Sequence, residues 1–233
     1  MATKRPSVVV TGANRGIGLE LVLQYLANDW QVHGCCRRPE LATQLAGLAS
    51  NSSLSIHQLD VSNPDSVKKL ALALSAQSID LLINNAGVYG GDRQSFGDID
   101  YAQWTRVLEV NTFGPYRVST ALADQVGNSE QRMIVNISSA MGSIERYTSG
   151  GHYIYRSSKA ALNMVTVNLA HDLHSRGITV LSVHPGWVRT DMGGSSADIS
   201  AQASATGLRQ LISNTTIEDS GRFFSWDGSV LPW

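Results

Sequence analysis

Six short apolar runs, separated by longer segments of helical pattern, most constrain what this chain can fold into. The runs are rich in β-branched residues and lie at residues 7–11, 31–36, 54–59, 79–84, 133–138 and 178–184. Strands that alternate with helices predict a parallel sheet, because parallel strands need a helical crossover between them. Stretches such as SVVV, LLIN and MIVNIS are apolar at consecutive positions, which indicates strands buried on both faces. We therefore expect an α/β fold with a single doubly wound parallel sheet and helices on both faces.

The size and charge of the chain narrow the classes of partner. With 233 residues, 42% of them hydrophobic, the chain can bury the core of one domain spanning residues 1–233. The net charge is −1, and the basic residues are scattered apart from Arg37 and Arg38. No basic stripe is present that could follow a phosphate backbone, so we expect no nucleic-acid partner.

The cysteines and the apolar segments indicate the compartment. Cys35 and Cys36 are the only two cysteines and are adjacent, so they cannot bridge distant segments. The segment MATKRPS leads into VVVTG, which is too short for the apolar region of a secretory signal. No stretch approaches the roughly 18 apolar residues of a membrane span. We expect a cytoplasmic protein with no membrane partner.

A glycine-rich turn joins the first apolar run to the first helical pattern. The run ends in TGANRGIG, residues 11–18, and LELVLQYL follows directly. Gly12 permits a tight turn, Gly16 lets the backbone approach a pyrophosphate, and Gly18 allows close packing of helix on strand. The helix N-terminus supplies unpaired N–H donors for phosphate. The turn predicts a Rossmann-type dinucleotide site whose contacts are Gly12, Asn14, Arg15, Gly16, Ile17 and Gly18.

The end of the second run indicates which dinucleotide is bound. A carboxylate there selects the 2′-hydroxyl of NAD, whereas an arginine accommodates the 2′-phosphate of NADP. The run ends in GCCRRP, with no acid at Cys36 and with Arg37 and Arg38 following. Arg15 in the glycine turn provides a second approach to the phosphate. The sequence predicts NADP(H), the alternative being that Arg37 and Arg38 only solubilise a loop.

The stretch YIYRSSKAAL, residues 153–162, holds a candidate acid. Tyr155 and Lys159 are four residues apart, so on a helix their side chains share one face. Taken alone, the pair is more typical of a surface helix whose lysine lies over a tyrosine ring. Tyr153 has Ser157 four residues on, so it is expected to line a substrate pocket rather than to act as the acid.

Five patterns occur in one order along the chain. They are TGANRGIG, Asp60 in QLDV, NNAG at residues 84–87, NISS at residues 136–139, and Tyr155-x-x-x-Lys159. Together they resemble the short-chain dehydrogenase/reductase family from residue 7 to the C-terminus, and HPGWVRTDM adds a further matching segment. Within that family, YIYRSSKAALN and GRFFSWDGSVLPW resemble the Sniffer/C-factor-like carbonyl reductase branch.

The resemblance implies the catalytic groups. Tyr155 gives its phenolic proton to a substrate carbonyl while hydride arrives from the nicotinamide, and Lys159 also bonds the nicotinamide ribose. A phenol with a pKa of about 10 is a sluggish acid, and a nearby ammonium favours the phenolate left after transfer. Ser139 holds the carbonyl oxygen, and Asn111 in NTFG holds a water that feeds protons toward Lys159. The simpler alternatives are that Ser139 caps a strand and that Asn111 caps or kinks a helix.

The serine assignment has an alternative because the gap before Tyr155 is longer than in many relatives. The extra residues fall in GSIERYTSGG, residues 142–151, whose glycines suit a bulging loop. We carry over Ser139, with Ser138 as the alternative.

The resemblance also implies the rest of the cofactor site. Asp60 and the backbone of Val61 contact the adenine, and NNAG ties neighbouring strands while letting the cofactor lie close. The alternatives are an Asx turn at Asp60, a plain turn at NNAG and a helix start after the sixth run. The further contacts implied are Asn85, Ala86, Gly87, Pro185, Val188 and Thr190.

The substrate side and the assembly are less constrained. Residues 193–205, GGSSADISAQASA, predict a mobile loop over the ligand or a solvated connector. Trp187 and Met192 close the pocket with Tyr153, or belong to the core. His171 and His174 lack a third ligand, so we expect no metal. A homodimer or homotetramer through the Tyr155 helix is implied by the resemblance.

These observations predict an NADPH-dependent reductase of a small ketone, aldehyde or quinone. One alternative is a 3-oxoacyl-thioester reductase, although no basic patch is evident for a carrier's phosphopantetheine. Another is a regulatory protein that senses NADPH without turnover, against which the intact Tyr155 and Lys159 argue.

Overall fold

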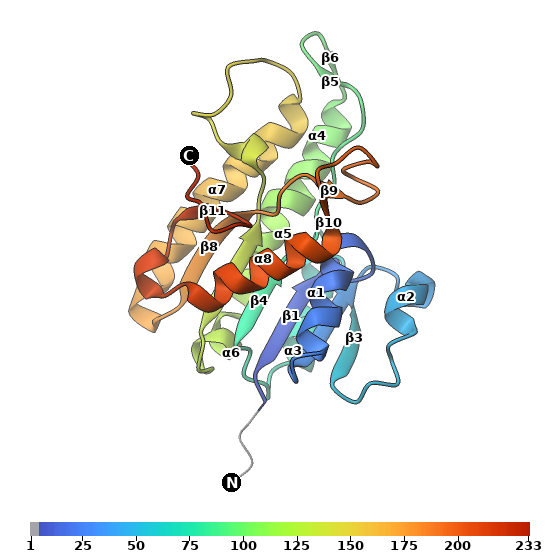
Figure 1. Ribbon diagram of the computed structural model, residues 1–233, viewed down its shortest axis with the longest axis vertical. Coiled ribbons are helices and arrows are strands. Elements are labelled where there is room, and N and C mark those ends of the chain that lie inside the picture. The colour runs from blue at the N-terminus through green and yellow to red at the C-terminus, as the bar shows by residue number, and fades with distance from the viewer. Residues whose placement is uncertain (1–4) are drawn as a thin grey trace.

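The computed structural model describes residues 5–233 and contains a seven-stranded parallel sheet between two layers of helices (Figure 1). The strand order across the sheet is β11-β8-β7-β4-β1-β2-β3, so the chain reverses its direction of winding between β1 and β4. This confirms the predicted doubly wound α/β fold. Residues 1–4, which include part of the segment considered for a secretory signal, lie outside the described residues. The strands are β1 (Ser7–Thr11), β2 (Gln31–Cys36), β3 (Leu54–Gln58), β4 (Leu81–Asn84), β7 (Met133–Ile137), β8 (Thr179–His184) and β11 (Phe223–Ser225).

All six apolar runs form strands, and the sheet has a seventh strand, β11, that was not predicted. This strand has three residues and pairs with β8 at the edge of the sheet, with Phe223 opposite Ser182. Its pattern is too short for a periodicity to be recognised. The Phe223 ring also stacks on Trp233, with ring centroids 5.5 Å apart, which ties the end of the chain to this edge.

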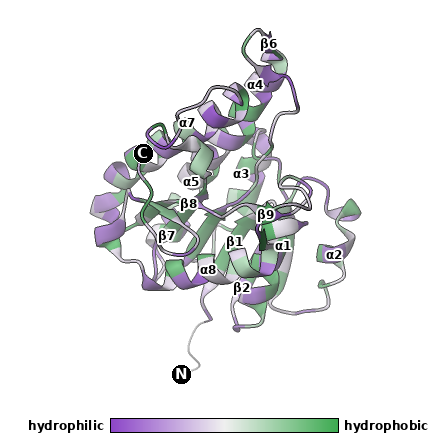
Figure 2. Cartoon of the chain, turned by 45° about the horizontal axis from the view of Figure 1, so that its top comes forward, coloured by the Kyte–Doolittle hydropathy of each residue, from purple (hydrophilic) through white to green (hydrophobic). Residues whose placement is uncertain are grey.

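The helices cover the two faces of the sheet with separate apolar cores. On one face, α1 and α8 pack together and bury Leu21, Val22 and Leu208. On the other, α3, α5, α6 and α7 contribute a second core that includes Leu70, Val118 and Leu169. Figure 2 shows hydrophobic colour on the strands between these layers. The helices are α1 (Gly16–Leu26), α2 (Thr43–Ala46), α3 (Pro64–Ala73), α4 (Tyr101–Leu108), α5 (Gly114–Ala121), α6 (Ala123–Gly127), α7 (Tyr153–Leu173) and α8 (Ala201–Asn214).

The loop predicted at residues 193–205 is shorter in the structure. Ile199–Ser200 forms β10, which pairs with β9 (Val188–Arg189), and α8 begins at Ala201. The Ser200 hydroxyl accepts a hydrogen bond from the Ala203 N–H at 3.0 Å, so it caps the helix. The prediction of a loop over residues 201–205 is wrong, because the small residues of AQASA are compatible with a helix and Ser200 provides its cap.

Short elements border the carboxyl ends of the strands. A hairpin of β5 (Gln94–Ser95) and β6 (Asp98–Ile99) follows β4, and a π-helical turn, Glu109–Phe113, joins α4 to α5. The segment 143–152, between the 3₁₀ turn Ala140–Gly142 and α7, has no regular structure, as predicted for the inserted loop. No helix of residues 5–233 is long and apolar enough to cross a membrane.

Candidate active site

A cavity of about 680 Å³ lies at the carboxyl ends of the central strands. It opens beside β1 and β4, where the winding of the sheet reverses and ligands bind in sheets of this kind. The structure brings most of the predicted cofactor residues together on its wall. They are Gly12, Asn14, Arg15, Gly16, Ile17, Gly18, Arg37, Arg38, Asp60, Val61, Asn85, Ala86, Gly87, Tyr155, Lys159, Pro185 and Thr190.

The glycine turn has the backbone that the sequence predicted. Gly12 and Gly16 adopt positive φ values of 67° and 55°, which side chains disfavour. A Cβ on Gly18 would lie 2.2 Å from the Gly12 carbonyl oxygen, so only glycine allows this approach of helix to strand. The N-terminus of α1 thus opens beside the cavity, and its first N–H groups are available to an anion.

Asn85 joins the end of β4 to the end of β1. Its amide nitrogen donates to the carbonyl oxygens of Thr11 at 2.9 Å and Gly12 at 3.2 Å. The Thr11 hydroxyl accepts from the N–H groups of Asn85 and Ala86, both at 3.0 Å. The predicted role of NNAG in tying neighbouring strands is therefore observed, and Ala86 and Gly87 keep side-chain bulk off this wall.

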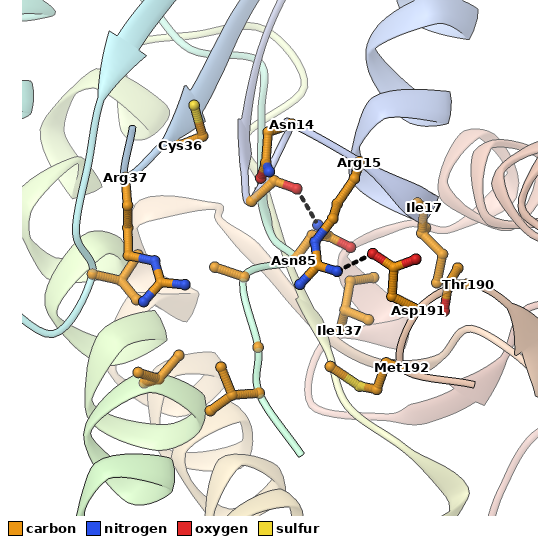
Figure 3. A pocket seen from close by; sticks show the side chains of 18 of the residues that line it. Asn14, Arg15, Ile17, Cys36, Arg37, Asn85, Ile137, Thr190, Asp191 and Met192 are labelled. Carbon is orange, nitrogen blue, oxygen red and sulfur yellow. Dashed lines mark hydrogen bonds and ion pairs between the residues drawn. The ribbon is translucent and has the colours of Figure 1, made fainter. Parts of the chain in front are cut away.

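The basic residues divide into two groups around the cavity. Arg37 and Arg38 follow β2, as predicted. Arg15, expected to approach the same phosphate, instead forms an ion pair with Asp191 from the loop after β9 (Figure 3). Both of these side chains are mostly exposed, so the pair is weak and a stronger anion can replace the carboxylate. Asp191 is a further cavity residue, and no sequence motif indicated it.

Asp60 follows β3, where it lines the cavity as predicted for an adenine contact and also forms the Asx turn given as the alternative. One carboxylate oxygen accepts from the Ser62 N–H at 3.0 Å and from the Ser62 hydroxyl at 2.6 Å, which is an Asx-type turn. The residue nevertheless lines the cavity together with Val61. The turn fixes the carboxylate at the predicted adenine end.

Tyr155 and Lys159 lie in the first two turns of α7, and both are buried. The Lys159 Nζ lies 5.8 Å from the centroid of the Tyr155 ring and donates to the Ile137 carbonyl oxygen at 2.7 Å. Burial lowers the pKa of Lys159 to about 8. Burial raises the pKa of Tyr155 to about 12, while a hydrogen bond with Ser139 lowers it and Tyr89 and Tyr147 raise it further.

Burial is the main cause of the raised pKa of Tyr155, and the expected help of Lys159 to the phenolate stays a prediction. Removing Tyr155 from water disfavours the phenolate by more than its neighbours favour it. The phenol consequently holds its proton at neutral pH, which is the state that a proton donor requires.

The two serines after β7 have different partners. The Ser138 hydroxyl donates to the Asn163 side chain at 2.6 Å and is buried against α7. The Ser139 side chain interacts with Tyr155, and its oxygen accepts the Met141 N–H at 3.1 Å. This arrangement favours Ser139 as the serine beside the phenol, although Ser138 lines the cavity and Ser139 does not.

Asn111 lies in the π-helical turn and is fully buried. Its amide nitrogen donates to the Val88 carbonyl at 2.9 Å and to the Ser158 hydroxyl at 3.1 Å, while its oxygen accepts the Val88 N–H at 2.9 Å. It therefore joins the chain after β4 to α7. The water assigned to it stays a prediction.

Several predicted residues lie away from the cavity wall. Val188 is buried in β9 and does not line the cavity. Tyr153 and Trp187 are 40% and 50% exposed and also lie outside the cavity. Met192 lines the cavity, as expected. A further residue beside the phenol, not predicted from the sequence, is Tyr89, whose ring packs against Tyr155 with centroids 5.0 Å apart. Within residues 5–233, no group of three or more His, Cys, Asp or Glu side chains could hold a metal.

Comparison with known proteins agrees with this geometry. Residues 6–200 match the short chain dehydrogenase family. The chain is 43% identical over 155 residues to the C-signal protein of Myxococcus xanthus. The aligned segment covers 66% of this chain and 93% of that protein. The NADPH-bound carbonyl reductase from chicken fatty liver superposes with a TM-score of 0.92 at 37% identity, covering 99% of this chain and 100% of that one. The carbonyl reductase Sniffer of D. melanogaster gives a TM-score of 0.92 at 35% identity with the same coverage.

These matches confirm the predicted resemblance to the Sniffer/C-factor-like branch. The family match extends from the first strand to the start of α8, and the two solved structures share the whole fold. The chain therefore belongs to the short-chain dehydrogenase family.

Proposed function

We propose that this protein reduces a small carbonyl compound, a ketone, aldehyde or quinone, with NADPH. The observation that carries the proposal is the joint placement of Tyr155 and Lys159 on one wall of a cavity that also contains the glycine turn and Arg37. The similarity to a carbonyl reductase described as NADPH-bound supports the choice of cofactor.

The described residues fit a phosphorylated dinucleotide. The positive φ values of Gly12 and Gly16 and the N-terminus of α1 suit a pyrophosphate. Arg37 and Arg38 would bind a 2′-phosphate through charge-assisted hydrogen bonds, and Arg15 would join them once released from Asp191. Bound there, the cofactor supplies a hydride.

The chain itself supplies the proton and its positioning. A buried Tyr155 with a pKa of about 12 is protonated at neutral pH and can donate to the oxyanion that forms as the carbonyl is reduced. Lys159, with a pKa lowered to about 8, still carries its proton for most of the time at pH 7 and stabilises the phenolate left behind. Ser139, beside Tyr155, would hold the carbonyl oxygen in line.

The test follows the oxidation of NADPH and NADH with a panel of ketones, aldehydes and quinones. Tyr155→Phe removes only the acidic hydroxyl and is expected to lower kcat by a factor of about 10² to 10⁴. Tyr116→Phe is the matched control, because this tyrosine of α5 is exposed and lies outside the cavity. If Tyr155→Phe keeps wild-type activity on the best substrate, the assignment of the acid is wrong. If NADPH binds but no carbonyl of the panel is turned over, the result counts against the proposed reduction and favours a nucleotide sensor.

A further inference from the structure

Gln94 is a buried side chain whose polar atoms all have partners around Tyr155. It begins β5 and is 2% exposed. Its amide nitrogen donates to the carbonyl oxygens of Tyr89 at 3.1 Å and Gly91 at 2.6 Å, and its oxygen accepts the Tyr155 N–H at 2.9 Å. The reversed amide would set its oxygen against two carbonyls and its NH₂ group against an N–H, so the hydrogen bonds fix one orientation.

The bond to Tyr155 satisfies the N-terminus of α7. The first N–H groups of a helix have no partner within the helix and are usually capped by the preceding side chain. Here the preceding residue, His152, has a φ of 53° and makes no side-chain cap. Gln94 caps the helix from another part of the fold, at the residue that carries the phenol.

The two bonds to carbonyls fix the loop that covers the phenol. Tyr89 packs against the Tyr155 ring, and its hydroxyl lies 2.7 Å from Nδ1 of His152. Gly90, between the two bonded carbonyls, has a φ of 97°, and a Cβ there would lie 2.8 Å from Val107 and 3.0 Å from Ile154. The loop is therefore pressed against α4 and α7, where a change at Gln94 would move the Tyr89 ring.

From this geometry we propose that Gln94 is a positioning residue for the reduction, holding Tyr155 and the covering Tyr89 ring in their relative places. The inference rests on the proposed function, because it assigns Gln94 a part in that reaction. Gln94 does not line the cofactor cavity, so its effect falls on the transfer to the carbonyl and not on binding of the dinucleotide.

The main test replaces Gln94 by methionine, which has a similar length and no hydrogen-bonding amide. We expect Gln94→Met to lower kcat by a factor of about 10 to 100, because a displacement of the acid by about 1 Å has such an effect. The Kd for NADPH should stay within about twofold of wild type. The exposed Gln77→Met is the control. A kcat within about twofold of wild type, or a Kd that rises as much as kcat falls, would overturn the proposal.

A pH-dependent rescue separates positioning from folding. In Gln94→Glu, the ionised side chain cannot donate to the carbonyls of Tyr89 and Gly91, whereas the protonated side chain regains one donor. The kcat of this variant, divided by that of wild type at each pH, should therefore rise as pH falls from about 8 to about 5. Comparison with wild type at each pH corrects for the ionisable side chains around Gln94 that both proteins share, which are Tyr89, Tyr147, His152, Tyr155 and Lys159. This variant decides the matter if the methionine variant fails to fold, since a flat ratio contradicts the role of the donors.

A structural readout distinguishes this proposal from the proposed function. In Gln94→Met, the Tyr155 amide proton should exchange with solvent at least about tenfold faster, because its acceptor is gone. If wild type reduces no carbonyl but this protection is lost as expected, the function is wrong and the positioning is right. If protection is unchanged, the positioning is wrong whatever the activity.

Discussion

His33 should make the stability of this protein fall in mild acid. The side chain is buried on β2, and its Nδ1 lies 3.1 Å from Nε2 of His57 on β3. Within residues 5–233, its Nε2 has no hydrogen-bond partner. Burial, and then the neighbouring His57, lower the pKa of His33 to about 4. The fold therefore accommodates the neutral imidazole and disfavours the imidazolium.

The sign and size of the effect follow from proton linkage. The unfolded chain binds a proton with a pKa of about 6.5 and the folded chain with a pKa of about 4, so between these values the unfolded state holds more protons. Stability is thus complete above about pH 7 and is lost as pH falls toward 4. Between pH 7 and pH 5, this one group removes about 2 kcal/mol of unfolding free energy.

Urea denaturation at pH 7 and pH 5 measures this loss. His33→Leu places an apolar side chain at the site and removes the titrating group. Between pH 7 and pH 5, the free energy of unfolding of this variant should therefore fall by about 2 kcal/mol less than that of wild type. The exposed His174→Leu serves as the control and should keep the wild-type pH dependence. An identical pH dependence in wild type and His33→Leu would refute the reasoning.

Three further predictions concern the cofactor and the assembly. Arg37→Ala should raise the Kd for NADPH by a factor of about 10 to 100 and leave that for NADH within about twofold, by fluorescence titration; equal losses would remove the phosphate argument. Gly18→Ala should weaken both cofactors, because its Cβ would lie 2.2 Å from the Gly12 oxygen; unchanged titrations would show that the turn relaxes freely. Light scattering should find a homodimer or homotetramer, and a monomer at every concentration would exclude that assembly.

The parts of the site that sequence predicted are those encoded locally. The turn at Gly12, Gly16 and Gly18 is a short pattern between a strand and a helix, and its geometry depends on few other residues. Tyr155 and Lys159 share a helix face because of their spacing alone. Since consecutive parallel strands end at the same edge, their motifs meet at one cavity once the fold class is known.

The parts that sequence did not predict depend on contacts between distant segments. Gln94 and Tyr155 are separated by 61 positions, and nothing in the hairpin sequence indicates a cap for α7. The pairing of Arg15 with Asp191 joins the glycine turn to a loop 176 positions later. The raised pKa of Tyr155 likewise depends on burial, which is a property of the packed fold.

Lys159 shows how the packing of α7 prepares a binding site. Among the described residues, its ammonium donates a hydrogen bond to the Ile137 carbonyl oxygen alone. Burial with only this one acceptor disfavours the charged form and lowers the pKa of Lys159. The backbone of Lys159 also packs closely against the 3₁₀ turn before α7, since a Cβ on Gly142 would lie 2.8 Å from the Lys159 carbonyl carbon. The side chain also lines the cavity, where sugar hydroxyl groups would provide the acceptors that the protein does not. The same buried charge that weakens the free fold therefore favours binding of a ligand rich in hydroxyl groups.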